Sequence, residues 1–296
     1  MRPDNIRHAA YFMLLATVFF AAMGALVKYV AATLPNEMVV FFRSAFGLLT
    51  LLPWLMRRGA PTLRTKRPLA HVTRSAFGLA SMACFFYAIG YMPLGDAVLL
   101  NYAAPLFIPF VAWLWLGERI SARLFTIIGL GFLGIALILK PRLGLFTPVA
   151  LIGLVSGIFA AVAMTGAREL TRTEPSSRIV FYFTLTCTVV SAAPLPWAWR
   201  TPTGHVWWAL IGLGVCASLA QLFMTRAYAL APATHSGPFV YATIVFATLL
   251  GWVFWNEVPD PWSVLGALIV CFAGVLMIRY GESKAAPPAG SPPTQA

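Results

Sequence analysis

The side chains best suited to bind a polar ligand are a few ionisable residues inside long apolar stretches, namely Arg43, Arg226 and His235. A charged group inside a membrane is costly, so it usually faces a cavity or a partner. Arginine presents a planar fork of donors that suits a carboxylate or a phosphate, and histidine exchanges a proton near neutral pH. These residue types predict a site for an anionic or zwitterionic small molecule, with His235 as the candidate for proton coupling.

Each of these residues also has a structural interpretation, and both alternatives stay open. Arg43 lies about two turns into its apolar stretch, where it either binds the ligand or ties neighbouring helices through backbone carbonyls. Arg226 either binds the ligand or extends to lipid headgroups, and headgroup contact is the interpretation favoured for Lys28 and Arg74. His235, the one histidine expected inside the helix bundle, either carries a proton or makes a structural hydrogen bond.

Two polar segments interrupt apolar stretches, one around Asn101 and Tyr102, the other between His235 and Tyr241. Pro105 and Pro238 lie in them, and a proline frees a carbonyl that a membrane tolerates only where protein or water satisfies it. We therefore expect Asn101, Tyr102 and Tyr241 to line a cavity, although tyrosine is also common in interfacial aromatic belts. Gln221, in the same apolar stretch as Arg226, and Tyr87, at the position equivalent to Arg226 in the internal repeat, complete the predicted substrate site.

The elements that must position these residues are long hydrophobic helices. Of 296 residues, 60% are hydrophobic and 10% charged, and the mean hydropathy is +0.81, which is unlike a soluble domain. Apolar stretches long enough to cross the hydrocarbon core predict spans at 9–30, 37–56, 69–91, 95–117, 121–139, 147–166, 178–199, 206–230, 233–256 and 261–279. The predicted fold is an all-α integral membrane protein with ten transmembrane helices.

The basic residues predict the orientation. The net charge is +12, and with a cytoplasmic N-terminus only Lys28, Lys140, Arg142 and Arg200 fall on the outer side. Positive loops stay cytoplasmic during insertion, so both termini are expected inside the bacterial inner membrane. The basic residues do not gather on one face with stacking aromatics, which argues against nucleic-acid binding. The lipid bilayer and a small-molecule substrate are the expected partners.

A shift of 139 residues reveals an internal repeat. It aligns Tyr102 with Tyr241, and it also aligns prolines, tryptophans and glutamates that follow in the same order: Pro93 with Pro232, Trp113 with Trp252, Glu118 with Glu257. Tyr87 corresponds to Arg226. Five spans per copy is an odd number, so consecutive copies must enter the membrane from opposite sides, as in many secondary transporters. The prediction is two inverted five-helix repeats.

Several segments resemble the EamA domains of the drug/metabolite transporter superfamily: Pro35 to Arg43, Tyr87 to Pro93, Pro105 to Glu118, and the second copy ending at Asn256-Glu257. The resemblance implies a first EamA repeat over 1–140, a second over 141–281 and a disordered tail over 282–296. It also implies a central cavity and a homodimer face at the fifth and tenth spans. Residues 238–260 are similar to exporters of opine-type metallophores, which are amino-carboxylate ligands.

The predicted function is export, by alternating access, of a small polar metabolite that carries carboxylates. Uptake of a compound such as S-adenosylmethionine or riboflavin is the alternative that family members suggest. An intramembrane enzyme is the remote alternative, because the sequence has no H-E-x-x-H motif, no paired carboxylates at mid-span and no Ser/His arrangement. No metal or cofactor site is expected, since Cys84, Cys187, Cys216 and Cys271 show no metal-ligand spacing.

Overall fold

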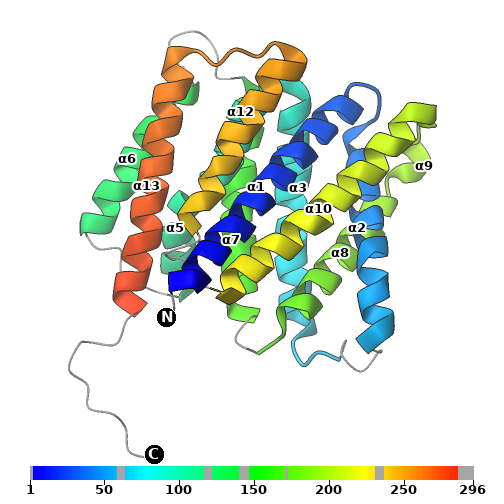
Figure 1. Cartoon of the computed structure of the whole chain (residues 1–296), viewed down its shortest axis with the longest axis horizontal. Coiled ribbons are helices and arrows are strands. Elements are labelled where there is room, and N and C mark those ends of the chain that lie inside the picture. Colours follow the sequence, from blue (N-terminus) through cyan, green and yellow to red (C-terminus); the bar gives the residue numbers. More distant parts are fainter. Residues whose placement is uncertain are drawn as a thin grey trace, which may run out of the picture.

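The structure is a computed structural model that describes residues 3–58, 64–116, 122–139, 147–170, 173–230 and 237–285. These residues form a bundle of helices (Figure 1). In chain order the elements are α1 (Pro3–Ala31), α2 (Asn36–Arg58), α3 (Pro68–Tyr91), α4 (Leu94–Tyr102), α5 (Ala104–Leu116), α6 (Ala122–Leu139), α7 (Pro148–Leu170), α8 (Ser176–Ala192), α9 (Leu195–Ala198), α10 (Gly204–Leu230), η3 (Gly237–Tyr241), α12 (Ala242–Trp255) and α13 (Pro261–Ala285).

The helices follow the predicted apolar stretches closely, and two of those stretches are broken where the sequence indicated. The fourth stretch forms α4 and α5, which meet at Ala103. The ninth begins as the 3-10 helix η3 and becomes α-helical at Ala242. Under the 139-residue shift these two breaks fall at equivalent positions. The repeated polar segments therefore correspond to repeated interruptions of regular helix.

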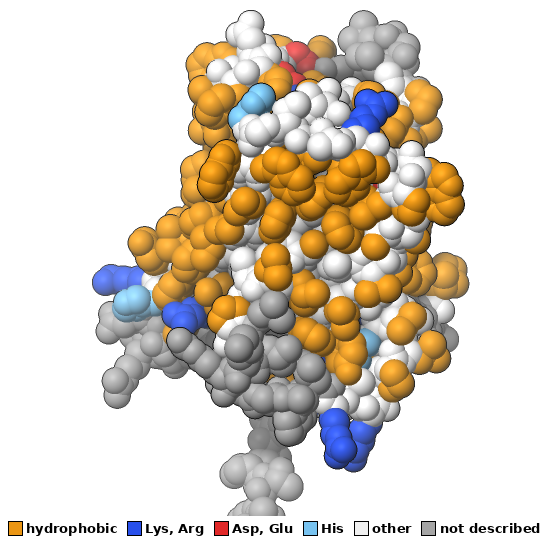
Figure 2. Space-filling view, turned by 90° about the vertical axis from the view of Figure 1, so that its right-hand side faces the viewer, with side chains coloured by type: hydrophobic (Ala, Val, Ile, Leu, Met, Phe, Trp, Pro, Cys, Tyr) orange, Lys and Arg blue, Asp and Glu red, His pale blue; other side chains and the backbone are white. Residues whose placement is uncertain are grey.

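The surface has the distribution expected of a membrane protein. Segments in α1, α3, α4 with α5, α7 and α10 are long and apolar enough to cross a bilayer, and shorter apolar helices accompany them. Leu114, Trp208 and Val253 are 82%, 76% and 71% exposed, which suits lipid rather than water. In Figure 2 hydrophobic side chains cover the middle of the face in view, and most charged side chains lie toward its upper and lower ends.

The helix packing repeats itself under exchange of the two halves. The long α1 crosses α10, and the equivalent contact joins α7 to α3; α10 packs on α2, and the equivalent contact joins α3 to α8. At one edge of the bundle α6 lies beside α13, and near the opposite edge α2 lies beside α8 (Figure 1). The start of α1 and the end of α13 lie toward the same end of the bundle (Figure 1).

Candidate functional site

Two arginines, one buried and one half-buried, lie between α2, α3 and α8. The Arg43 side chain comes from α2 and is 8% exposed. The Arg74 side chain comes from α3, and its guanidinium carbon lies 3.8 Å from the centre of the Phe183 ring in α8, which is a cation–π contact. Arg43 is one helical turn before Gly47, whose added Cβ would lie 3.7 Å from Thr184 Cγ2, and Arg74 is one turn before Gly78, whose added Cβ would lie 2.7 Å from Phe183 Cε2. Two positive charges therefore lie in the same part of the bundle.

Polar atoms without a hydrogen-bond partner lie in the same turns of α2 and α3 as these arginines. Within the described part of the chain, Arg43 Nε and Arg74 Nε and Nη1 are buried and unpaired. The same holds for the hydroxyls of Ser44 and Ser75 and for both ring nitrogens of His71. We call these five residues the polar constellation. Buried polar groups in proteins are nearly always paired, so such a concentration of free donors and acceptors is typical of a ligand site.

The polar constellation borders an ion-paired loop region at one end of the bundle. Glu174, which precedes α8, accepts a hydrogen bond from the Thr65 hydroxyl at 2.6 Å and forms an ion pair with Arg178. Burial raises the pKa of the Glu174 carboxyl, but the hydrogen bonds from Thr65 and Arg178 and the charges of Arg178 and His71 outweigh it, so the pKa is lowered. Glu174 is thus held as a carboxylate, and its charge is committed to this loop contact.

Asn101, at the end of α4, belongs to a separate hydrogen-bonded group. Its Nδ2 donates to Ser156 Oγ at 3.1 Å and to Ser81 Oγ at 3.4 Å, and Ser81 Oγ donates to the Ser156 carbonyl at 2.8 Å. An added Cβ on Gly157 would lie 2.6 Å from the Leu100 carbonyl oxygen. The amide therefore joins α3, α4 and α7 where the backbones of α4 and α7 are very close.

The three predicted tyrosines lie in different surroundings. Tyr87 of α3 is half-buried, with its ring centre 4.7 Å from that of Tyr91. Tyr102 ends α4 and packs against the main core. Tyr241 is buried at the start of α12, and its hydroxyl occupies the notch left by Gly274 of α13, because a Cβ at Gly274 would lie 1.7 Å from it. Tyr241 therefore faces α13, away from the α2–α8 edge.

The remaining predicted residues lie in or beyond α10. Gln221 is half-buried and Arg226 is exposed, so Arg226 does not join Arg43 in the interior of the bundle. His235 lies outside the described residues. The histidine that the structure does place inside the bundle is His71, which is 2% exposed and has its ring centre 4.7 Å from that of Tyr182. The expectation that His235 is the one internal histidine is therefore wrong.

At the end of the bundle opposite the start of α1, a charged contact joins the two halves. Lys28 of α1 forms an ion pair with Glu257 and donates a hydrogen bond to the Met92 carbonyl at 2.8 Å. The other oxygen of Glu257 accepts from the Leu94 backbone N–H at 2.9 Å, at the N-terminus of α4. Lys28 is therefore paired with protein groups and not with lipid headgroups. We call Lys28, Glu257 and Leu94 the inter-repeat clasp.

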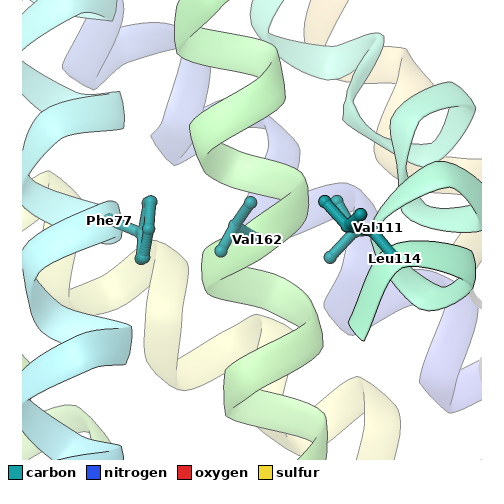
Figure 3. A pocket seen from close by; sticks show the side chains of 4 residues that line it. All are labelled: Phe77, Val111, Leu114 and Val162. Atoms are coloured by element: carbon teal, nitrogen blue, oxygen red, sulfur yellow. The ribbon is translucent and has the colours of Figure 1, made fainter. Parts of the chain in front are cut away.

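An apolar hollow of about 400 Å³ lies between α3, α5 and α7. It is lined by Phe77, Val111, Leu114 and Val162, which come from these three helices (Figure 3). Leu114 is largely exposed on the surface that suits lipid. Among the described residues, none of the predicted site residues lines the hollow, and the four side chains that line it are apolar and carry no hydrogen-bond donor.

Sequence reasoning found Arg43 but missed Arg74 and His71. Both lie within about two turns of the start of α3, where a long cationic side chain ordinarily reaches the headgroups. The usable signal was their spacing, because His71, Arg74 and Ser75 follow an i, i+3, i+4 pattern that places them on one face of a helix. That face turns toward α8 and α7, so all three are shielded from lipid.

Comparisons with known proteins show the family of the chain. The sequence profile described as the EamA-like transporter family matches residues 8–140 and again residues 147–280. The chain is 36% identical to the pseudopaline exporter CntI of Pseudomonas aeruginosa strain UCBPP-PA14, over 93% of this chain and 98% of that protein.

Two further relatives and one solved structure extend the likeness. The chain is 29% identical to an S-adenosylmethionine uptake transporter of Rickettsia felis, over 92% of both chains. It is also 29% identical to a riboflavin transporter of Vibrio cholerae, over 95% of this chain and 97% of that one. A crystal structure with 20% identity superimposes with a TM-score of 0.64 over 94% of this chain and 99% of that one, which supports the fold.

A helical membrane protein whose two halves both match one transporter profile, and which resembles transporters along nearly its whole length, is not an enzyme but a carrier protein. The chain belongs to the EamA-like transporter family.

Proposed function

We propose that this membrane transporter exports a small metabolite bearing carboxylates across the bacterial inner membrane by alternating access. The observation that carries the proposal is Arg43, a guanidinium buried among α2, α3 and α8 with its Nε unpaired. A carboxylate is the natural partner of such a group, because charge-assisted hydrogen bonds from arginine are short and strong. Since Arg43 is buried, α2, α3 and α8 must move apart for a ligand to enter, as alternating access requires.

The architecture that we propose is ten spans in two inverted five-helix repeats, residues 1–140 and 141–281, with both termini cytoplasmic. The equivalent helix contacts, α1 with α10 and α7 with α3, support an exchange symmetry between the halves. The common end of the bundle for Pro3 and Ala285 supports an even number of crossings (Figure 1). The excess of basic loops on that side favours the cytoplasm.

Export is favoured by the similarity to the pseudopaline exporter CntI and by the resemblance of residues 238–260 to metallophore exporters. Uptake is the second candidate direction, and the similarity to S-adenosylmethionine uptake transporters favours it. The other residues predicted to touch substrate are Tyr87, Asn101, Tyr102, Gln221, Arg226, His235 and Tyr241. Asn101 already donates hydrogen bonds to Ser81 and Ser156, so its amide can bind substrate only after α3, α4 and α7 rearrange.

The deciding experiment is metabolite profiling of culture medium from a deletion strain that carries the wild-type gene, an empty vector, Arg43→Gln or Arg200→Gln. We expect a carboxylate-bearing compound to fall at least about tenfold in the medium without the transporter, and to stay low with Arg43→Gln, because loss of a charged hydrogen bond costs about 1.5–3 kcal/mol. Arg200→Gln is the matched control, since Arg200 is exposed in the connection between α9 and α10.

Two results would contradict the proposal. Normal export by Arg43→Gln, at wild-type protein abundance, would remove Arg43 from the site. A compound that disappears from the medium only when the transporter is present would reverse the direction and favour uptake.

A further inference from the structure

The polar constellation holds two positive charges and, within the described residues, no negative one. In the described part of the chain, no ion pair joins Arg43 or Arg74 to a carboxylate. The described acidic side chains near α8 and α7 are committed elsewhere, Glu174 to Arg178 and Thr65, and Glu169 to Arg67. Two like charges in a medium of low dielectric repel strongly, and a buried unpaired charge is costly. A dianion would balance this pair.

Contacts with α7 and α8 fix the position of the Arg74 side chain. The aliphatic stem of Arg74 lies on Gly166 of α7, whose added Cβ would meet Arg74 Cβ at 3.5 Å. The Arg74 guanidinium lies on the Phe183 ring at 3.8 Å. That ring in turn occupies the space above Gly78, where an added Cβ would come within 2.7 Å of Phe183 Cε2. Gly78 and Phe183 thus form a seat for Arg74 that leaves its Nε and Nη1 free.

Arg43 and Arg74 approach each other from opposite directions. Arg43 lies near the start of α2 and Arg74 near the start of α3, and these adjacent helices run antiparallel (Figure 1). Arg43 and Arg74 each lie one turn before the glycine, Gly47 or Gly78, at which their helix contacts residues 183–184 of α8. Their donors therefore face one region from two ends, which suits a ligand with an anionic group at each end better than one with a single anionic group.

We propose that Arg43 and Arg74 form a two-cation pocket that binds two carboxylate groups of one substrate molecule, so that the substrate class is a dicarboxylate. This inference rests on the proposed function and narrows it. Arg43 and Arg74 each bind one carboxylate, and the hydroxyls of Ser44 and Ser75 and the ring of His71 supply the neighbouring hydrogen bonds. A monocarboxylate neutralises one guanidinium and leaves the other buried and unpaired.

The test is ligand binding to the purified full-length chain in nanodiscs of zwitterionic lipid, followed by the shift in thermal unfolding midpoint. The probes are glutamate against glutamine and aspartate against asparagine, pairs that differ by one carboxylate, with inorganic phosphate as a separate arm. We expect each dicarboxylate to bind at least about tenfold more tightly than its amide partner, as one extra charged hydrogen-bonded pair predicts. Equal binding within each pair, binding of phosphate alone, or no binding by any probe would overturn the proposal.

Substitutions test whether the preference for a dicarboxylate over its amide partner comes from Arg43 and Arg74. Arg74→Gln should abolish the difference between glutamate and glutamine, Arg74→Lys should restore part of it, and Arg43→Gln should weaken binding of both. Gly78→Ala should reduce the preference by displacing Phe183, whereas Gly129→Ala in α6 should leave it intact because nothing lies within 4 Å of its new Cβ. Retention of the full preference in a folded Arg74→Gln protein would overturn the proposal.

This experiment separates the inference from the function on which it rests. If medium profiling identifies an exported monocarboxylate whose export needs Arg43 but not Arg74, the two-cation pocket fails and the exporter stands. If the dicarboxylates bind as expected but no compound accumulates outside the cell, the export proposal fails and the pocket stands.

Discussion

Glu174 illustrates how a single charged side chain can join loops at the end of a membrane bundle. It holds Thr65, from the segment before α3, and Arg178, at the start of α8, at the same carboxylate. A second ion pair, between Arg67 and Glu169, links the same region to the end of α7. Because Arg67 and Glu169 are partly exposed, their ion pair contributes little to the stability of the protein. The buried Glu174 carboxylate contributes most of the stability of this contact between loops.

We predict that Glu174→Gln lowers stability by about 1–3 kcal/mol and changes its pH dependence. The folded-state pKa of Glu174 is lowered from 4.5, so its contribution is complete above pH 4.5 and is lost as the pH falls through the folded-state value. Thermal unfolding in detergent should show a constant gap between wild type and variant from about pH 8 to pH 5, narrowing in acid. A gap that widens in acid would contradict this assignment. Glu169→Gln is the matched control, with an expected loss of less than about 1 kcal/mol.

A single buried residue could be predicted only where its neighbours in the sequence indicate that it is buried. Arg43 was identifiable because an apolar stretch surrounds it on both sides in the sequence. Arg74 was not, because its burial comes from Gly166 and Phe183, which lie about a hundred residues away in the chain. Lys28 was misinterpreted for the same reason, since its partner Glu257 belongs to the other repeat.

Whole helices were easier to predict than single contacts. The apolar stretches gave the helix ranges to within a few residues, because the length needed to cross a bilayer and the positions of proline determine them. The interruptions at Tyr102 and Tyr241 were also predicted from proline and polar residues. The break between α8 and α9 near Pro194 was not predicted, although Pro194 and Pro196 signalled it.

At the element scale, packing between α6 and α13 depends on a missing side chain. An added Cβ on Gly134 would lie 2.8 Å from the Gly266 carbonyl oxygen and 3.0 Å from the Val270 nitrogen, both backbone atoms. We predict that Gly134→Ala destabilises the protein by about 1–3 kcal/mol, as overpacking does. Gly129→Ala in the same helix is the control, because nothing lies within 4 Å of its Cβ position. Equal unfolding midpoints for the two variants would contradict this packing.

The start of α13 offers a second prediction at this scale. Asp260 Oδ1 accepts hydrogen bonds from the backbone N–H groups of Trp262 at 3.0 Å and Ser263 at 3.2 Å, as an N-cap does. Asp260→Ala should therefore cost about 1 kcal/mol, and Asp260→Asn much less, because asparagine also caps helices. Thermal unfolding of the purified variants measures both. A loss of similar size in Asp260→Asn would indicate that charge, rather than capping, stabilises this end.

The whole molecule is organised by the duplication, which the sequence revealed through paired prolines, tyrosines and tryptophans. The exchange symmetry of helix contacts follows from it, since α1 meets α10 as α7 meets α3. The binding chemistry departs from that symmetry. Under the 139-residue shift Arg43 corresponds to Tyr182, next to Phe183, so one copy supplies the cation and the other supplies the aromatic seat of a second cation. The two repeats share one scaffold, but the proposed binding residues of the first copy are not repeated in the second. Repeat analysis alone does not reveal this difference.

The proposed orientation gives a prediction for the whole chain. Green fluorescent protein fused after Ala285 should fluoresce, and alkaline phosphatase fused there should be inactive, because both report a cytoplasmic location. The same reporters inserted between Trp199 and Gly204, in the connection that precedes α10, should give the opposite result. Phosphatase activity at the Ala285 fusion would contradict the proposed cytoplasmic C-terminus. Together with a cytoplasmic N-terminus, it would require an odd number of crossings and would exclude the inverted-repeat arrangement.

The inter-repeat clasp bears on turnover. Lys28 and Glu257 are only 11% and 19% exposed, and Glu257 also holds the N-terminus of α4, so separating the two halves at this end exposes three polar groups at once. In the alternating-access cycle proposed above, each opening of this end breaks these bonds and each closing forms them again. In that cycle the clasp raises the activation barrier for opening, so we expect its loss to give faster opening and a less tight seal.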